Sequence, residues 1–330
     1  MDIRSSPCDL GLDKSNSIRQ VLNIVTQCDE HYAQHLSVML LSLVEHNQHH
    51  VLNVFVIIPQ NMQESTLVKI RHSSSDSCNL HFLKANPNLV QSLKVFRHVT
   101  CSTYYKLFMG ELLPQGLRKV IYLDADIVVR GRLDDLWNFG HGPSIVAAVT
   151  DSFVEANPQF KSKLGLDPGE PYFNAGVLLI DLNRWRQARV GSEAVAFAHY
   201  HADRISFADQ CPLNWVLRDR WINLPEVWNL QTSSLVVGSH YGHMDYSGAA
   251  KEKGVAARII HFSGDSKPWH YMNNHPFKRD YFAYLSRTGW KHYRHPDYTL
   301  RNFLRKNVYK FAPFIYRLRY SPQSAVLHRP

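Results

Sequence analysis

The sequence has 330 residues, of which 45% are hydrophobic and 20% are charged, a balance typical of a folded globular protein. It contains no run of about 18 apolar residues, which argues against a membrane-spanning helix, and its five cysteines lack the close spacing of a zinc ribbon or redox motif. We therefore expect one large domain in a reducing, cytoplasmic environment, with a tail.

The net charge of +9 is concentrated at the C-terminal end. Residues 287–330 hold ten Lys and Arg side chains and one acid, Asp297, so residues 1–286 are neutral overall. Residues 1–20 are polar, with Pro7 and Gly11 among them, and are predicted to be a disordered leader. We expect a domain over residues 21–286 and a basic tail over residues 287–330 that meets a negative partner.

Strands and helices are predicted to alternate along the domain. Apolar runs predict strands at 21–26, 51–58, 79–83, 119–123, 144–149 and 177–181. Helical spacing predicts helices at 35–46, 63–73, 104–113, 183–188 and 209–217. This alternation indicates an α/β fold with a mainly parallel central sheet between helices, ending near Ile260.

Asp124-Ala125-Asp126 follows the strand predicted at 119–123. Ligands of α/β proteins gather at the carboxyl ends of the strands, where these two acids would lie. Carboxylate oxygens suit Mg²⁺ or Mn²⁺. The pattern predicts a divalent-cation site, although Asp-x-Asp alone also occurs in ordinary turns.

Three further polar clusters stand next to predicted strands or helices. His261 to Trp269 (HFSGDSKPW) follows an apolar run, and in it His261 could complete a metal site while Lys267 could hold a phosphate. Phe173-Asn174-Ala175-Gly176 leads into a strand, and Asp209-Gln210 opens a helix. Taken singly, these clusters could be a surface turn, a loop and a helix N-cap.

The order of these motifs resembles family 8 of the glycosyltransferases, most of all the bacterial lipopolysaccharide galactosyl- and glucosyltransferases. The resemblance rests on YLDAD at 122–126, YFNAGV at 172–177, Asp209-Gln210, and His261-x-x-Gly264-x-x-Lys267-Pro268-Trp269, and it covers residues 21 to 270. It implies a GT-A fold, which is Rossmann-like, a UDP-galactose or UDP-glucose donor, Mn²⁺ with Mg²⁺ possible, and retention of anomeric configuration.

The resemblance also implies roles for single residues. Those at the metal would be Asp124, Asp126 and His261. Those at the donor would be Asp29 facing the uracil, Gly264 and Lys267 on the diphosphate, and Asn174, Asp209 and Gln210 around the sugar. Ala125 would also contact the donor, as would Lys106, where relatives often carry an arginine. Asp151 would lie near the acceptor.

Retention limits the choice of mechanism. A double displacement needs a nucleophile on the far face of the sugar, usually a carboxylate. Gln210 is a neutral amide and a poor nucleophile, although Asp209 stands beside it. We therefore favour front-face attack, in which a departing phosphate oxygen takes the acceptor proton and Lys267 helps the metal to stabilise the leaving group.

Two other classes of protein share part of this pattern. A haloacid-dehalogenase-like phosphatase also carries Asp-x-Asp after a strand, but there the motif normally follows an early strand of the domain. Such a phosphatase would also need a second aspartate after Gly264-Asp265, and Trp269 stands at that position. A nucleic-acid-binding tail would explain basic residues among aromatic ones. Because the body is neutral and carries no nucleic-acid module, no nucleic acid is expected as a partner.

The tail contains a predicted amphipathic helix. Leu300, Phe303, Leu304, Val308 and Phe311 share one arc of a helical wheel, and Arg301, Arg305, Lys306 and Lys310 lie outside it. Basic amphipathic helices bind anionic membrane surfaces. This predicts a peripheral enzyme on the cytoplasmic face of the bacterial inner membrane, close to a lipid-linked glycan acceptor; the alternative is that the apolar arc packs on the domain.

Overall fold

A computed structural model describes residues 19–74, 78–90, 93, 101–240, 243–295 and 297–311. Residues 1–18 of the predicted leader and residues 312–330 of the tail lie outside this range. The strands are β1 (Val21–Gln27), β2 (Val51–Pro59), β3 (Cys78–Ala85), β4 (Lys119–Leu123), β5 (Ile127–Val129), β6 (Val146–Thr150), β7 (Phe173–Asp181), β8 (Trp221–Asn223), β9 (Leu230–Gln231), β10 (Val236–His240), β11 (His243–Tyr246) and β12 (Ile259–His261).

The α-helices are α1 (Ala33–His46), α2 (Glu64–Arg71), α3 (Met109–Leu112), α4 (Asp134–Trp137), α5 (Ser152–Glu155), α6 (Gln159–Leu164), α7 (Leu182–Gln187), α8 (Val190–Tyr200), α9 (Gln210–Leu217), α10 (Ala250–Ala256), α11 (Lys278–Leu285) and α12 (Leu300–Phe311). Short 3₁₀ segments are η1 (Pro87–Leu89), η2 (Cys101–Phe108), η3 (Glu226–Trp228) and η4 (Thr232–Ser234).

The central sheet has seven strands in the order β3-β2-β1-β4-β7-β6-β8. Neighbours are parallel except at β7, which runs antiparallel to both β4 and β6. Eight of the nine β7 residues are buried, as expected for a strand covered on both faces. The predicted α/β fold with a mainly parallel sheet is therefore confirmed.

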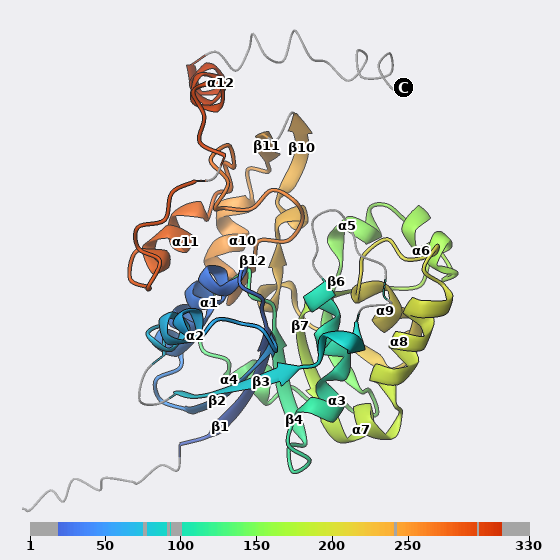
Figure 1. The fold of residues 1–330 in the computed structure, drawn as a ribbon. Coiled ribbons are helices and arrows are strands. Elements are labelled where there is room, and N and C mark those ends of the chain that lie inside the picture. Colours follow the sequence, from blue (N-terminus) through green and yellow to red (C-terminus); the bar gives the residue numbers. More distant parts are fainter. Residues whose placement is uncertain are drawn as a thin grey trace, which may run out of the picture.

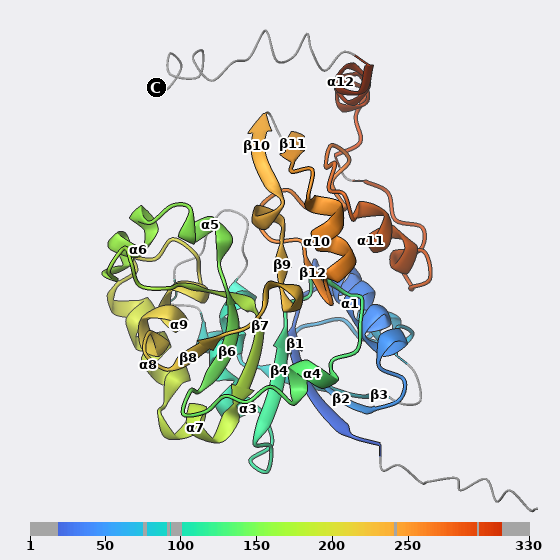
Figure 2. The same cartoon turned by 180° about the vertical axis from the view of Figure 1, so that it is seen from behind.

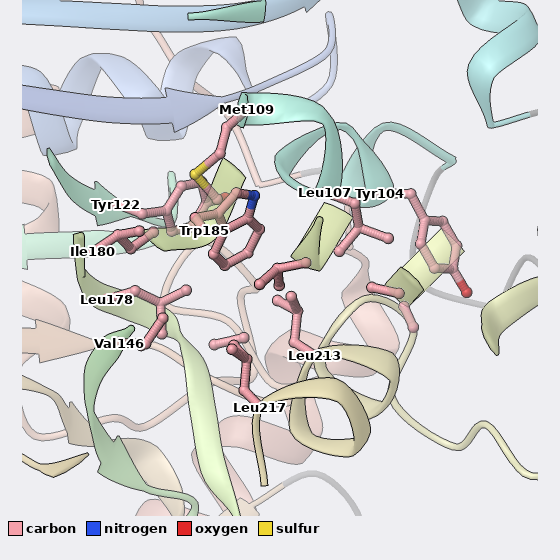
Figure 3. Packing of buried hydrophobic residues seen from close by; sticks show 14 of the residues in the cluster. Tyr104, Leu107, Met109, Tyr122, Val146, Leu178, Ile180, Trp185, Leu213 and Leu217 are labelled. Atoms are coloured by element: carbon pink, nitrogen blue, oxygen red, sulfur yellow. The ribbon is translucent and has the colours of Figure 1, made fainter. Parts of the chain in front are cut away.

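Helices cover both faces of this sheet (Figures 1 and 2). Along β4, Val120 and Tyr122 belong to the hydrophobic cluster that contains Trp185 of α7, which Figure 3 shows from close by. The intervening Ile121 and Leu123 belong to the cluster on the other face, with residues of α1, α2 and α4. This alternation is the two-residue period of a strand buried on both sides.

A small second sheet, β5-β12-β9, brings the strand that follows Asp124 and Asp126 next to the strand that ends at His261. β12 pairs antiparallel with β5, so that His261 lies opposite Ile127, the residue after Asp126. β12 also pairs parallel with β9, which sets His261 opposite Gln231. Residues more than a hundred positions apart in sequence are thus brought together.

Two element boundaries differ from the prediction in ways that affect the site. The helix predicted at 104–113 is instead η2 followed by the short α3. Gln27 of β1 donates from Nε2 to the Thr103 carbonyl at 2.8 Å, so this carbonyl has a partner outside the helix. The strand predicted at 177–181 begins at Phe173, so Asn174 to Gly176 lie inside β7.

The chain after Ile260 forms part of the body before it reaches α12. Tyr281 of α11 and His35 of α1 share a 2.7 Å hydrogen bond, and Arg287 forms an ion pair with Glu45. His295 and Tyr293 both bond to the Trp269 carbonyl. Contacts with the body therefore continue beyond residue 287. In both views α12 stands at the outer end of this segment (Figures 1 and 2), where its Lys306 donates to the Tyr271 carbonyl.

Candidate active site

Asp124 and Asp126 flank the turn between β4 and β5, at the carboxyl end of β4. The Asp124 backbone N–H donates to the Gly176 carbonyl of β7 at 2.8 Å. Its carboxylate accepts a 2.8 Å hydrogen bond from Tyr122. Asp126 is buried, and its carbonyl accepts from the Phe262 N–H at 3.0 Å. Ala125 lies buried between them.

His261 completes a compact group with these two aspartates. Its Nε2 lies 3.4 Å from Asp126 Oδ1 and 3.8 Å from Asp124 Oδ2. The candidate ligand atoms of the three residues all lie within 4.8 Å of one another. A Cβ on Gly176 would lie 2.3 Å from His261 Cε1 and 2.8 Å from Asp124 Oδ2. Glycine is therefore required at this position of β7 for the histidine to approach the aspartates.

Hydrogen bonds fix which nitrogen of His261 carries a proton. The Gly176 N–H donates to Asn174 Oδ1 at 3.0 Å, which makes this oxygen an acceptor. Asn229 Nδ2 donates to the same oxygen at 2.9 Å. Asn229 Oδ1 is then left to accept from His261 Nδ1 at 3.0 Å. With a proton on Nδ1, the ring turns Nε2 toward the two carboxylates, where this nitrogen can act as a metal ligand.

This arrangement fits a divalent cation. The two carboxylates and the His261 Nε2 converge on one position, where a single cation can bond to all three. Two carboxylate oxygens and one imidazole nitrogen form a donor set that Mn²⁺ and related metals accept. The hydrogen bond from the other ring nitrogen is the outer contact that metal-bound histidines usually make. Asp124, Asp126 and His261 can therefore hold a divalent metal.

Lys267 lies beside this group. Its Nζ donates to Asp126 Oδ2 at 2.5 Å and to the Phe262 carbonyl at 2.7 Å. Burial opposes the charged form of Asp126, but attraction to Lys267 and His261 outweighs it and holds the pKa of the carboxyl below its usual range. Burial likewise opposes the charged form of Lys267, yet attraction to Asp126 raises its pKa.

Lys106 of η2 is a second buried cation. Only 2% of its side chain is exposed, and Nζ lies 3.1 Å from Asp124 Oδ1 and 2.8 Å from Asp209 Oδ2. It also donates to the Ala175 carbonyl at 3.1 Å. Burial opposes its charged form, but the two carboxylates outweigh this and raise the pKa of Lys106. Lys106, which was predicted to lie at the sugar donor, thus links Asp124 to the Asp209-Gln210 motif.

The residues predicted around the sugar and acceptor form one network. Gln210 Oε1 accepts from the Ala175 N–H at 3.0 Å, and its Nε2 donates to Asp151 Oδ2 at 3.0 Å. Asn174 Nδ2 donates to the same Asp151 oxygen at 2.9 Å. Asp151 Oδ1 caps α5 by accepting the N–H groups of Phe153 and Val154. The structure therefore brings Asn174, Asp209, Gln210 and Asp151 together.

Asp29 and Gly264 occupy the margins of the site. Asp29 precedes α1, where its carboxylate accepts the N–H groups of His31 and Tyr32 and the Ser102 hydroxyl of η2. Gly264 has a φ of +80°, the left-handed conformation that favours glycine, in the turn between β12 and Lys267. The predicted roles of Asp29, Gly264 and the other named side chains in binding stay predictions.

Asn229 and Thr103 were not predicted from the sequence. Asn229 is fully buried between η3 and β9 and bonds to both His261 and Asn174. Thr103 donates to Asp209 Oδ1 at 2.5 Å. The sequence signal for Asn229 is faint: two amides, Asn229 and Gln231, alternate around an apolar residue in a segment too short to be recognised as a strand.

Comparison with known proteins places these residues in a family. The model of glycosyl transferase family 8 matches residues 23–273, most of the chain. General stress protein A of Bacillus subtilis is 29% identical over 82% of this chain and 95% of its own length. Lipopolysaccharide 1,2-glucosyltransferase of Escherichia coli is 26% identical over 82% of this chain and 80% of its own length.

A crystal structure of the galactosyltransferase LgtC, in complex with donor and acceptor sugar analogs, aligns with a TM-score of 0.71 and 25% identity. It covers 81% of this chain and 96% of that one. The similarity confirms the GT-A fold, and the matches give no support to a phosphatase. A family model spanning more than half of the chain, over the motifs that meet at the end of β4, leads to one conclusion: this protein is a member of glycosyltransferase family 8.

Proposed function

We propose that the protein transfers galactose or glucose from a UDP-sugar to a glycan acceptor, with retention of configuration and with Mn²⁺ or, alternatively, Mg²⁺ at Asp124, Asp126 and His261. The observation that carries the proposal is the position of His261 Nε2, which faces two carboxylates at the carboxyl end of β4 while Nδ1 bonds to Asn229. When bound, the metal supplies Lewis-acid stabilisation of the diphosphate oxygens.

The two buried lysines have different tasks in this proposal. Lys267 approaches the pair from the β12 turn, and its compact charge can stabilise a diphosphate that leaves beside Asp126. Lys106 is held by three acceptors and offsets the negative charge of Asp124 and Asp209. We therefore assign leaving-group stabilisation to Lys267 and charge balance at the donor to Lys106.

Front-face attack suits the hydrogen bonding of the candidate nucleophiles. Both ends of the Gln210 amide have partners, and both oxygens of Asp209 accept hydrogen bonds. In the proposed step the bond between the sugar C1 and the diphosphate oxygen breaks while the acceptor oxygen bonds to C1 on the same face. The departing phosphate oxygen takes the acceptor proton, so no carboxylate bonds to the sugar.

The donor and acceptor classes come from the relatives. One is named a lipopolysaccharide 1,2-glucosyltransferase, another, from Salmonella typhimurium, a lipopolysaccharide 1,3-galactosyltransferase. We propose lipopolysaccharide core or a similar cell-surface glycan as acceptor. The test is UDP release from UDP-glucose and UDP-galactose with Mn²⁺, followed by NMR of the glycoside formed. An inverted product, or no turnover of either donor, would contradict the proposal.

We further propose that α12 binds an anionic membrane surface. Leu300 is 74% and Leu304 55% exposed, whereas Phe303 and Val308 of the same arc are 39% and 42% exposed. The two leucines therefore leave apolar surface open to solvent. On the other side of the helix, Lys306 donates to the Tyr271 carbonyl at 2.6 Å. The side chains of Lys310 and Phe311 lie outside the described residues. None of the described helices is long and apolar enough to cross a membrane.

Sedimentation with anionic vesicles tests this surface. The double variant Leu300→Glu, Leu304→Glu should release the protein from vesicles, while hydrolysis of the free donor persists. Val255→Glu is the control, because Val255 on α10 is an apolar residue that is even more exposed, at 85%. Binding should also weaken when about 0.5 M salt shortens the Debye length to a few ångströms. Salt-insensitive binding would argue against a peripheral enzyme at the cytoplasmic face of the bacterial inner membrane.

A further inference from the structure

A continuous chain of side-chain hydrogen bonds joins Gln210 to His261. It runs from Gln210 through Asp151 and Asn174 to Asn229, and each link measures 2.9 to 3.0 Å. Two backbone N–H groups of β7 fix its direction, one at Gln210 Oε1 and one at Asn174 Oδ1. The chain therefore has one arrangement of donors and acceptors, and Asn229 is the residue in it that contacts His261.

We propose that Asn229 is a positioning residue that connects the metal site with the sugar-binding side chains. This inference rests on the metal site of the proposed function. Its amide oxygen keeps the proton of His261 on Nδ1, so that Nε2 faces the metal position. Its amide nitrogen holds Asn174 in the orientation that lets Asn174 donate to Asp151. Asn229 itself acts through these neighbours and does not contact the reacting atoms.

The backbone around Asn229 is suited to this task. The side chain is fully buried, and the Asn229 N–H donates to the Glu226 carbonyl at 3.0 Å at the end of η3. The next residues, Leu230 and Gln231, pair with Ile260 and His261 across β9 and β12. Asn229 and His261 are therefore held by the same pair of strands, which restricts their relative movement.

The two halves of the amide can be separated by substitution. Asn229→Asp keeps an oxygen for His261 Nδ1 but places a second oxygen against Asn174 Oδ1, which already accepts from Gly176. Asn229→Leu has a similar size and removes both hydrogen bonds. The aspartate variant should thus retain the hydrogen bond to His261, whereas the leucine variant should lose the bonds to both His261 and Asn174.

Mn²⁺ binding measured by the EPR signal of free Mn²⁺, without donor and again with UDP, tests the metal half. Asn229→Leu should weaken Mn²⁺ binding by about 10- to 100-fold, as loss of an outer-shell contact typically does. Asn229→Asp should bind Mn²⁺ within about threefold of wild type, while its kcat for sugar transfer falls about tenfold or more because Asn174 is displaced.

Asn47→Leu is the matched control. Asn47 is also a fully buried amide with one donated and one accepted hydrogen bond, to Leu43 and from Leu133, but it lies at the end of α1 away from the site. It should reduce stability and leave Mn²⁺ affinity unchanged. Equal weakening by Asn47→Leu and Asn229→Leu, or no weakening by Asn229→Leu, would overturn the inference, as would an Asn229→Asp variant that transfers sugar at the wild-type rate.

Asp126→Ala separates this inference from the proposed function. If Asp126→Ala abolishes Mn²⁺ binding and Asn229→Leu does not change it, the metal site stands and the role of Asn229 is wrong. If neither variant changes Mn²⁺ binding, the proposed metal site itself is wrong, and the inference falls with it. Far-UV circular dichroism of each variant checks that it is folded.

Discussion

The described part of the chain contains two groups of histidine and aspartate whose ligand atoms lie within 4.8 Å of one another. One is the site group, Asp124, Asp126 and His261. The other, which we call the rim group, consists of His49, His50 and Asp134, between the end of α1 and the start of α4. His50 lies 2.9 Å and His49 3.3 Å from the Asp134 carboxylate. By composition and spacing alone, both groups would be candidate metal centres.

The surroundings of the ring nitrogens distinguish the two groups. His261 donates its Nδ1 proton to Asn229, which leaves Nε2 free for a cation. In the rim group a metal on His50 Nε2 would place the proton on Nδ1, which is buried without a hydrogen-bond partner. An unsatisfied buried donor costs about 1–3 kcal/mol. His261 of the site group is therefore prepared for a metal, and His50 of the rim group is not.

Charge balance points the same way. The site group has two carboxylates, and each is opposed by a buried lysine that also bonds elsewhere. The rim group has one carboxylate, and Arg132 donates to both of its oxygens at 2.9 Å. A cation would have to displace this arginine. We infer that the rim group is an ion-pair cluster, which shows that the outer contacts of a histidine distinguish metal sites better than composition does.

The largest expected difference between the groups is in catalysis. Asp126→Ala should reduce sugar transfer to less than about one tenth of wild type, because it removes a charged metal ligand. Asp134→Ala should leave transfer within about twofold, because surface ion pairs contribute little beyond local stability. Initial rates at saturating Mn²⁺ measure both. If Asp126→Ala retained most of its activity, the site group would lose its assignment as the metal centre.

Gly176→Ala tests the geometry of the site group without removing a ligand. The added Cβ would overlap His261 and Asp124, so either the ring or the strand must move. A displacement of about 1 Å near reacting groups can cost about 100-fold in rate, and we expect a loss of this order. Gly140→Ala, close to α4, is the control because no atom lies within 4 Å of its added Cβ. Equal rates for the two variants would contradict the close approach of His261.

Much of the site could be predicted because its ligands follow strands. Asp124 and Asp126 stand directly after a buried run, and the carboxyl ends of parallel strands gather functional groups. The order of elements and the mainly parallel sheet follow from apolar runs of strand length, whereas the antiparallel direction of β7 was not predicted. The strand predicted at 177–181 is shorter than β7 because Asn174 and Gly176 interrupt the apolar pattern. These two residues break the pattern because they belong to the site.

The rest depends on contacts between distant segments. Asn229 meets His261 only because β9 pairs with β12, and β9 is two residues long. Lys106 could be aligned by resemblance, but its bonds to Asp124 and Asp209 depend on η2 packing closely against α8. A Cβ on Gly191 would lie 2.0 Å from the Leu107 carbonyl oxygen. The pairing of β9 with β12 and the packing of η2 on α8 join residues that are far apart in sequence, so no local sequence pattern predicts them.

Metal-dependent stability should give a smaller but direct comparison. A ligand at about 100 times its Kd stabilises the folded state by about 2.7 kcal/mol, which corresponds to a rise in Tm of several degrees for a chain of this size. We expect Mn²⁺ to raise the Tm of wild type and of Asp134→Ala and to leave that of Asp126→Ala unchanged. Loss of the shift in Asp134→Ala would make the rim group the metal centre.

The smallest expected effect is the pH dependence of the rim group's own contribution to stability. Hydrogen bonds from Arg132 hold the pKa of Asp134 below its usual range, although partial burial opposes this. Because the folded pKa is depressed, the stabilising effect is present above the unfolded value of about 3.9 and is lost as pH falls through the folded value. Asp134→Asn should therefore lower the free energy of unfolding more at neutral pH than at about pH 3, by up to about 1 kcal/mol.

Urea unfolding at the two pH values measures this difference, and Arg132→Gln provides the second arm of a double-mutant cycle. In the Arg132→Gln background the pH dependence of the Asp134→Asn effect should shrink, because the bonds that depress the pKa are gone. If it persisted unchanged, the histidines would be the main partners of Asp134. If Zn²⁺ raised the Tm of wild type but not of Asp134→Asn, the rim group would bind a metal after all, and the contrast with the site group would fail.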